Sequence, residues 1–108
     1  MFTLSAANAM TTYQLRIYTV RAGEMAEWLA EWGGKIVPLR RRLGFEIVGA
    51  WTIDETNRFV WIISHPGPQA WEDVDNAYYS SPERNALDPD PARHLASTEH
   101  WLMQRADA

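Results

Sequence analysis

An arginine and a tyrosine stand two residues apart in the run Tyr13–Val20, YQLRIYTV, and suit the stabilisation of a negative charge. Arg16 and Tyr18 share one face of a strand, because side chains alternate with a period of two. A guanidinium keeps its proton, so a buried Arg16 needs a carboxylate, a carbonyl or a ligand oxygen as its partner. An ion pair with an acidic neighbour at the sheet edge is the plainer interpretation, and stabilisation of an enolate or phenolate is the functional one.

Three histidines, His65, His94 and His100, can transfer protons near neutral pH. His65 is our first choice for a proton shuttle, because it ends a predicted strand beside the start of a helix, and His100 is the second. His94 is expected to be a capping or surface residue. The chain has no HxH or HExxH pair and no cysteine, so we expect no metal site and no disulfide.

The chain has six tryptophans in 108 residues, so some of them could form an aromatic pocket in which a flat ligand stacks between rings. Trp28 and Trp32 stand four apart, which is the spacing of an ordinary core stripe on one helical face, so core packing is favoured over ligand stacking. A domain of this size holds few indoles in its interior. We therefore expect some of them to line a cavity or a dimer interface.

The segment Tyr78–Pro91, YYSSPERNALDPDP, is either a lid over a site or a stiff strap back to the sheet. Its Asp-Pro-Asp-Pro end restricts the backbone and favours the strap. One of Tyr78 and Tyr79 should face the sheet and the other water or a partner, and the inward tyrosine can donate its hydroxyl to a bound oxygen.

Length and composition indicate one domain with one core. The net charge of −4 argues against nucleic acid and anionic membranes as partners. The first residues lack a basic leader, so we expect a cytoplasmic protein, with residues 1–10 as a flexible extension and 11–108 as the domain. GxSxG, P-loop, Rossmann and EF-hand patterns are absent, which argues against serine hydrolysis, nucleotide binding and EF-hand calcium.

Periodicity predicts the elements that position these residues. Strands are expected over 13–20, 45–53, 58–64 and, most weakly, 97–104, and helices over 24–43 and 69–79 with a short turn after Ser81. Pro38 should kink the first helix, with Gly33 and Gly34 absorbing the strain. The order β-α-β-β-α-β predicts an α+β, ferredoxin-like fold with both helices on one face of an antiparallel sheet.

The other face of the sheet is expected to be apolar and bare. The strand over 58–64 has apolar residues on both sides, Phe59, Trp61 and Ile63 against Val60 and Ile62. In the strand over 45–53, Phe45, Ile47 and Trp51 are expected on one face and Val48 and Ala50 on the other. An exposed apolar sheet promotes aggregation in a monomer, so a homodimer that packs sheet on sheet is expected.

Three stretches resemble the NIPSNAP family within the dimeric α/β-barrel superfamily: YQLRIYTVRAG at 13–23, GKIVPLRRRLGFEIVGAW at 34–51 and AYYSSPERNALDPDP at 77–91. The resemblance implies a homodimer whose two sheets join into a barrel, with a ligand pocket inside each subunit between the sheet and its own helices. The residues that we place around this pocket are Arg16, Tyr18, Trp28, Trp32, Trp61, His65, Trp71, Tyr78 and His100.

Three functions remain open on this basis. The first is a small enzyme without a cofactor, which isomerises, cyclises or oxygenates an aromatic or polyketide-like molecule. In this reading Arg16 and Tyr18 stabilise the oxyanion and His65 or His100 moves the proton. The second is a non-catalytic dimer that binds a hydrophobic small molecule or a protein partner, and the third is haem binding through one histidine. Fold membership does not choose among them.

Overall fold

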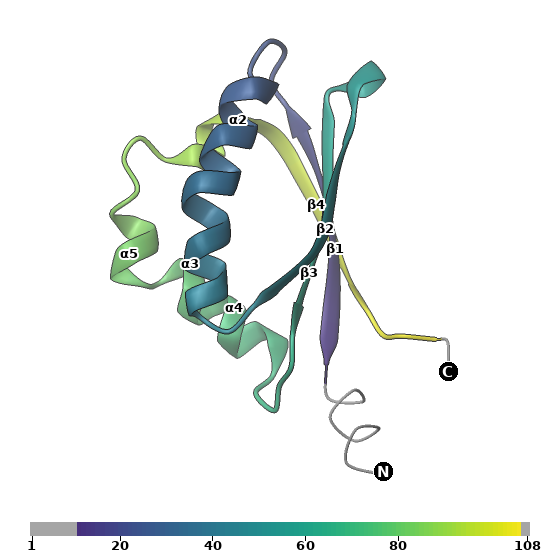
Figure 1. Cartoon of the computed structure of the whole chain (residues 1–108), viewed down its shortest axis with the longest axis vertical. Coiled ribbons are helices and arrows are strands. Elements are labelled where there is room, and N and C mark those ends of the chain that lie inside the picture. The colour runs from purple at the N-terminus through teal and green to yellow at the C-terminus, as the bar shows by residue number, and fades with distance from the viewer. Residues whose placement is uncertain (1–10, 107–108) are drawn as a thin grey trace.

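Four antiparallel strands form one sheet, in the order β2-β3-β1-β4. The computed structural model describes residues 11–106, with β1 at Thr12–Val20, β2 at Glu46–Ile53, β3 at Arg58–His65 and β4 at Leu95–Met103. The α-helices all lie on one side of the sheet and leave the other side bare (Figure 1). The expected ferredoxin-like α+β fold is therefore confirmed. The extension expected over residues 1–10 lies outside the described residues.

The central strand β1 turns its more polar face toward the helices. Gln14, Arg16 and Tyr18 are buried there, whereas Leu15 and Ile17 on the opposite face are half-buried. Arg16 lies opposite Trp61 on β3 and His100 on β4. Because β1 has a neighbour on each side, Arg16 sits in the middle of the sheet and not at its edge as expected.

The first helical segment contains one wide turn. It runs as α2 (Met25–Glu31), a π-helical turn (Trp32–Ile36) and α3 (Val37–Arg42). Pro38 has no N–H for the carbonyl of Gly34, and its ring would press on that carbonyl in a regular helix. The wider turn accommodates this defect. The expected distortion thus appears as a π turn one turn before the proline, and Gly33 and Gly34 belong to it.

The second helical segment is followed by an ordered connection to β4. Helix α4 (Trp71–Tyr79) leads into the short α5 (Pro82–Asn85) and the 3₁₀ turn Pro91–His94. The hydroxyl of Ser81 caps α5 by accepting the N–H of Arg84 at 3.1 Å. The Asp90 carboxylate caps the 3₁₀ turn by accepting the N–H of Ala92 at 2.9 Å. We call residues 80–94 the strap.

A β-bulge corrects one expected face. The register between β2 and β3 shifts between Ile47 and Gly49, so the extra residue Val48 reverses the alternation of the strand. Ile47 lies opposite the buried Ile63, whereas Trp51 lies opposite Val60 on the bare face. The expectation that Phe45, Ile47 and Trp51 share one face was therefore wrong for Trp51.

The covered face of the sheet holds the core. Its fully buried side chains are mostly aromatic and pack edge to face, for example Tyr18 on Trp28 and Trp28 on Phe59 with ring centroids 5.8 Å and 5.7 Å apart. The expected division of β3 into a buried row at Phe59, Trp61 and Ile63 is confirmed. Among the described helices, none has the length and apolar character that a bilayer crossing requires.

Candidate functional site

A cavity of about 200 Å³ lies between the sheet and the helices that cover it. Three arginines reach it from three elements, Arg16 from β1, Arg40 from α3 and Arg84 from α5. Five aromatic side chains form most of its wall: Tyr18, Trp28, Trp61, Tyr78 and Tyr79. The remaining lining residues are Ile36, Asp75, Ala92, Leu95, Thr98 and His100.

Arg16 donates hydrogen bonds in several directions from the floor of the cavity. Its Nε donates to Gln14 Oε1 at 2.6 Å, and its Nη1 donates to the hydroxyls of Tyr18 at 3.0 Å and Tyr79 at 2.9 Å. Its Nη2 donates to Asp75 Oδ1 at 3.1 Å. Burial opposes the charge of this group, but Tyr18, Tyr79 and Asp75 outweigh that effect and raise the pKa of Arg16.

Arg40 is buried more completely, and its side chain is 1% exposed. Its guanidinium carbon lies 3.6 Å from the ring centroid of Tyr78 and 4.6 Å from that of Phe45, so two aromatic rings flank the cation. Such desolvated cation–π contacts contribute about 2 kcal/mol. Arg40 was not among the pocket residues that the sequence predicted. Its position four residues after Ile36, which continues the spacing of Trp28 and Trp32, is the signal that places it inward.

Both buried arginines share a single carboxylate oxygen. Asp75 Oδ1 accepts from Arg40 Nη1 at 2.8 Å and from Arg16 Nη2 at 3.1 Å. Asp75 is the only carboxylate among the described residues that line the cavity. The ion pair expected for Arg16 therefore exists, with an aspartate of α4 as the partner. Two cations against one anion leave the cavity with one uncompensated positive charge.

Two cavity tyrosines, Tyr18 and Tyr78, keep their protons at neutral pH because the pKa of each is raised. Burial raises the pKa of Tyr18, although Arg16 opposes this shift. Burial likewise raises the pKa of Tyr78, against the influence of Arg40 and Arg84. Since Tyr18 accepts a hydrogen bond from Arg16, its own O–H remains able to donate to a ligand.

Four further donors on residues of the cavity wall have no acceptor among the described residues. They are the indole Nε1 of Trp28 and of Trp61 and the Nε of Arg40 and of Arg84, and all four are buried. Buried N–H groups are nearly always hydrogen bonded, and an unmade bond costs roughly 1–3 kcal/mol. Such groups are suited to a ligand that brings its own acceptors.

The strap contributes a third arginine to the wall. Arg84 Nη2 pairs with Asp90 Oδ1 at 3.0 Å, while its side chain is 11% exposed. Tyr78 is buried, whereas Tyr79 is exposed although its hydroxyl reaches Arg16. The expected division of the two tyrosines thus holds for burial, yet both line the cavity.

The structure brings six of the nine expected pocket residues together. Lining residues are Arg16, Tyr18, Trp28, Trp61, Tyr78 and His100. His100 is exposed and lies opposite Arg16 on the neighbouring strand. The other three expected residues, Trp32, Trp71 and His65, pack elsewhere. His65 accepts the N–H of Gly67 and stacks edge to face on Phe45, and burial lowers its pKa.

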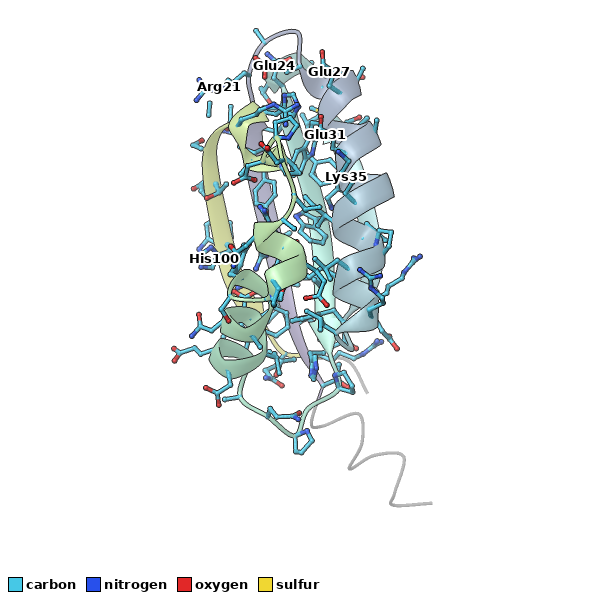
Figure 2. The ribbon with its side chains drawn as sticks, turned by 90° about the vertical axis from the view of Figure 1, so that its left-hand side faces the viewer. Arg21, Glu24, Glu27, Glu31, Lys35 and His100 are labelled. Atoms are coloured by element: carbon cyan, nitrogen blue, oxygen red, sulfur yellow. The ribbon has the colours of Figure 1, made fainter. Side chains whose placement is uncertain are left out.

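A second polar cluster lies between α2 and the strap (Figure 2). His94 is 3% exposed, so the expected surface position was wrong. Its Nδ1 lies 2.8 Å from Glu24 Oε1 and its Nε2 lies 3.2 Å from Glu31 Oε2, which requires a protonated ring that donates twice. Arg93 adds two hydrogen bonds to Glu31.

Ligand atoms of Glu27, Glu31 and His94 lie within 4.8 Å of one another, the spacing of a possible cation site. Both ring nitrogens of His94 are already held by carboxylates, however, and Arg93 occupies Glu31. This cluster is an ion-pair network that ties the strap to α2.

The comparisons with known proteins agree on family and fold. The family model described as NIPSNAP matches residues 13–106. A NIPSNAP family protein from Agrobacterium tumefaciens is 15% identical, with a TM-score of 0.78 over 90% of this chain and 87% of that chain. A NIPSNAP domain protein from Burkholderia xenovorans is 18% identical, with a TM-score of 0.76 over 88% and 94%.

A more distant similarity reaches another group of proteins on this fold. A candidate antibiotic biosynthesis monooxygenase from Nitrosomonas europaea is 10% identical, with a TM-score of 0.69 over 91% of this chain and 92% of that chain. At these identities the solved structures establish the fold alone. No curated protein matches this chain.

Proposed function

Because the chain belongs to the NIPSNAP family, whose fold does not specify a reaction, we propose from its cavity that it is a small cofactor-independent enzyme. Each subunit of a homodimer would act on an aromatic or polyketide-like molecule. The observation that carries this proposal is the Arg16–Tyr18 pair, which holds two hydrogen-bond donors at the floor of a cavity walled by aromatic rings. Paired donors in a water-poor site favour a reaction that develops an oxyanion.

The chemistry suited to these groups is proton transfer next to a carbonyl or a phenol. A base removes a proton from the substrate, and the electron pair moves to the oxygen as an enolate or phenolate. Arg16 and Tyr18 stabilise that oxygen, and His100 receives the proton and returns it at another position, which isomerises the substrate. We assign this step to His100 rather than His65, because His100 lines the cavity.

The homodimer is part of this proposal and is supported by the bare face of the sheet. Two cross-strand rows of large apolar residues lie on that face, Ile62–Leu15–Trp101 and Trp51–Val60–Ile17, and the second row ends at Glu99 on the edge strand β4. Trp51 and Trp101 are 53% and 48% exposed in the single chain. Four strands of eight and nine residues span a flat face of roughly 500 Å². The accessible surface of this face is larger than its flat area, because side chains project from it, and it approaches the ~800 Å² that each partner buries in a stable interface.

A non-catalytic dimer that binds a hydrophobic small molecule or a protein partner is the second candidate. One observation favours it. Asp75 is already engaged, because its Oδ1 accepts hydrogen bonds from two arginines, so His100 is the one remaining candidate base among the described residues of the cavity wall. A binding protein needs the cavity but no such group.

Crystals soaked with a panel of planar aromatic ketones and phenols would test the proposal. We expect a bound molecule whose oxygen contacts Arg16 or Tyr18, and turnover of that molecule in solution. His100→Asn should abolish turnover, and the control Glu72→Gln, at an exposed residue of α4 that does not line the cavity, should retain it. Binding without turnover would favour the second candidate, and an empty cavity after the whole panel would refute the first.

A further inference from the structure

We propose that the cavity selects a ligand with a single negative charge, namely a monocyclic aromatic carboxylate. This inference rests on the proposed function, because it names the substrate class of the same cavity. The argument uses the charges of the cavity wall, the unpaired donors, the size of the space and the chemistry of its walls.

Charge is the first step. Arg16 and Arg40 lie inside the protein and share one oxygen of Asp75, so this buried group keeps a net charge of +1. Arg84 adds a cation that its own partner, the exposed Asp90, neutralises. A buried charge without a counter-charge is costly, even after partial solvation. One bound anion would balance it.

The free donors indicate where the anion binds. Arg40 engages Asp75 through Nη1, while its Nε has no partner among the described residues. The unpaired indole N–H groups of Trp28 and Trp61 and the Nε of Arg84 belong to residues of the same cavity wall. The Tyr18 hydroxyl can also donate. A planar carboxylate offers two oxygens with several acceptor positions and matches the geometry of a guanidinium.

The size of the cavity limits the rest of the ligand. Drug-sized ligands occupy about 300–1,000 Å³, and an apolar cavity of about 150 Å³ accommodates benzene. The 200 Å³ found here fits one ring with a small substituent. Its walls carry five aromatic rings, which favour a flat apolar body.

A single charge distinguishes a carboxylate from a phosphate. A phosphate monoester carries nearly two negative charges above its second pKa of about 6. Such a dianion would reverse the net charge of the buried group to −1, whereas a carboxylate neutralises it. The structure therefore favours the carboxylate.

Isothermal titration of the full chain with benzoate, benzamide and phenyl phosphate at pH 8 tests this inference. Benzamide has nearly the shape of benzoate without its charge. We expect benzoate to bind at least roughly tenfold more tightly than either of the others, the usual effect of a hydrogen bond to a charged group. A soaked crystal should place its carboxylate against Arg40 and Tyr18.

Each of the other titration results would refute a specific part of this inference. Equal affinity for benzamide would refute the selection of an anion while leaving an aromatic-binding cavity, and with it the proposed function, intact. Tighter binding of phenyl phosphate would refute the single charge. Failure of all three probes to bind would refute the inference, and the proposed function fails separately only if neutral ketones and phenols leave the cavity empty as well.

Two variants separate this role from simple packing. Arg40→Gln should weaken benzoate binding about tenfold and leave benzamide unchanged. Because Arg40 is buried and its loss can unfold the chain, Asp75→Asn is the second variant. It raises the buried net charge to +2, so benzoate should bind more tightly than to the wild type, while Asp73→Asn on the exposed side of α4 serves as control. Weaker or unchanged benzoate binding in Asp75→Asn would overturn the inference.

Discussion

The hydroxyl of Tyr18 differs from those of the other cavity tyrosines in lying on the sheet itself, where it accepts a hydrogen bond from Arg16 and keeps its own proton for a ligand. Its raised pKa keeps the phenol protonated through the neutral range. Removing this hydroxyl removes one donor to the developing oxyanion but leaves the ring in the core.

Tyr18→Phe tests that role with the smallest change. We expect kcat on a substrate found by soaking to fall by about a hundredfold, as for the loss of one oxyanion donor. The unfolding free energy should change by only about 1 kcal/mol, because one hydrogen bond is lost and the ring still packs. The control is Tyr13→Phe on the opposite face of β1. Steady-state kinetics and urea melts measure both quantities, and an unchanged kcat would remove Tyr18 from the reaction.

The sequence predicted the strand residues of the cavity better than the helix residues. Arg16 was identified because a charged residue in an otherwise apolar strand needs a partner if it is buried. Tyr18 was identified with it because the two residues share one face of the strand. Asp75 was missed, since an acidic residue in a helix that also carries Glu72 and Asp73 is usually solvated. Which carboxylate meets Arg16 depends on how the helix crosses the sheet, and that angle results from packing that a single sequence does not display.

Between elements, the His94 network ties α2 to the strap and makes this contact depend on pH. Hydrogen bonding to Glu24, then to Glu31, raises the pKa of His94 against burial and the charge of Arg93. The groups that face the ring are these two carboxylates with Glu27 and Arg93. A histidine with a raised folded pKa stabilises the fold below its unfolded pKa of about 6.5, and this contribution disappears as the pH rises through the folded value.

We therefore expect His94→Gln to lose about 1 kcal/mol of stability at pH 6 and less at pH 9. His65 acts in the opposite direction, because burial lowers its pKa and its stabilising effect is lost as the pH falls below about 6.5. Urea melts from pH 5 to 9 should thus show stability rising more steeply with pH in His94→Gln than in the wild type. His100→Gln is the control. Identical slopes in wild type and His94→Gln would contradict the protonated network.

The π-helical turn offers a second test at this scale. Added Cβ atoms at Gly33 and Gly34 would meet nothing within 4 Å, and both glycines are helical. Glycine in a helix costs roughly 0.5–1 kcal/mol relative to alanine. Gly33→Ala and Gly34→Ala should each stabilise the chain by about that amount in urea melts.

Gly44 provides the matched contrast. Its φ is +93° and a Cβ there would lie 3.2 Å from His65 Nε2, so Gly44→Ala should destabilise the chain. If Gly33→Ala and Gly34→Ala also destabilise the chain, the π-helical turn itself requires glycine. That result would contradict the explanation that the turn forms only to accommodate Pro38.

Elements were predictable where one period dominates, and their irregularities were not. The alternation of β1 and the three- and four-residue spacing of α2 reflect burial on one side only, so they could be recognised without the structure. The bulge at Val48 depends on Trp51, whose indole lies over Gly49 so closely that a Cβ there would be 2.6 Å from it. Local spacing carries no sign of that contact.

For the whole molecule, the two faces of the sheet have separate tasks. The covered face holds the charged cavity. The polar residues of β1 can be buried there because a helix supplies the partner of Arg16, which is Asp75. The bare face holds the apolar alternates, Leu15 and Ile17 with Val60 and Ile62. An antiparallel sheet with one uncovered face usually carries polar residues on that face, so apolar residues there are unusual for a monomeric protein. The bare face is therefore better suited to contact with another protein surface than to exposure to water.

The proposed dimer predicts that one charge on this face separates the subunits. Sedimentation equilibrium of the wild type should give twice the chain mass of 12.4 kDa. Trp51→Glu should give the single-chain mass, because burying an unpaired carboxylate between two apolar sheets costs several kcal/mol and occurs once in each subunit. Leu29→Glu, at a partly exposed leucine of α2, is the control and should remain dimeric. A monomeric wild type, or a Trp51→Glu variant of unchanged mass, would refute the sheet-to-sheet dimer.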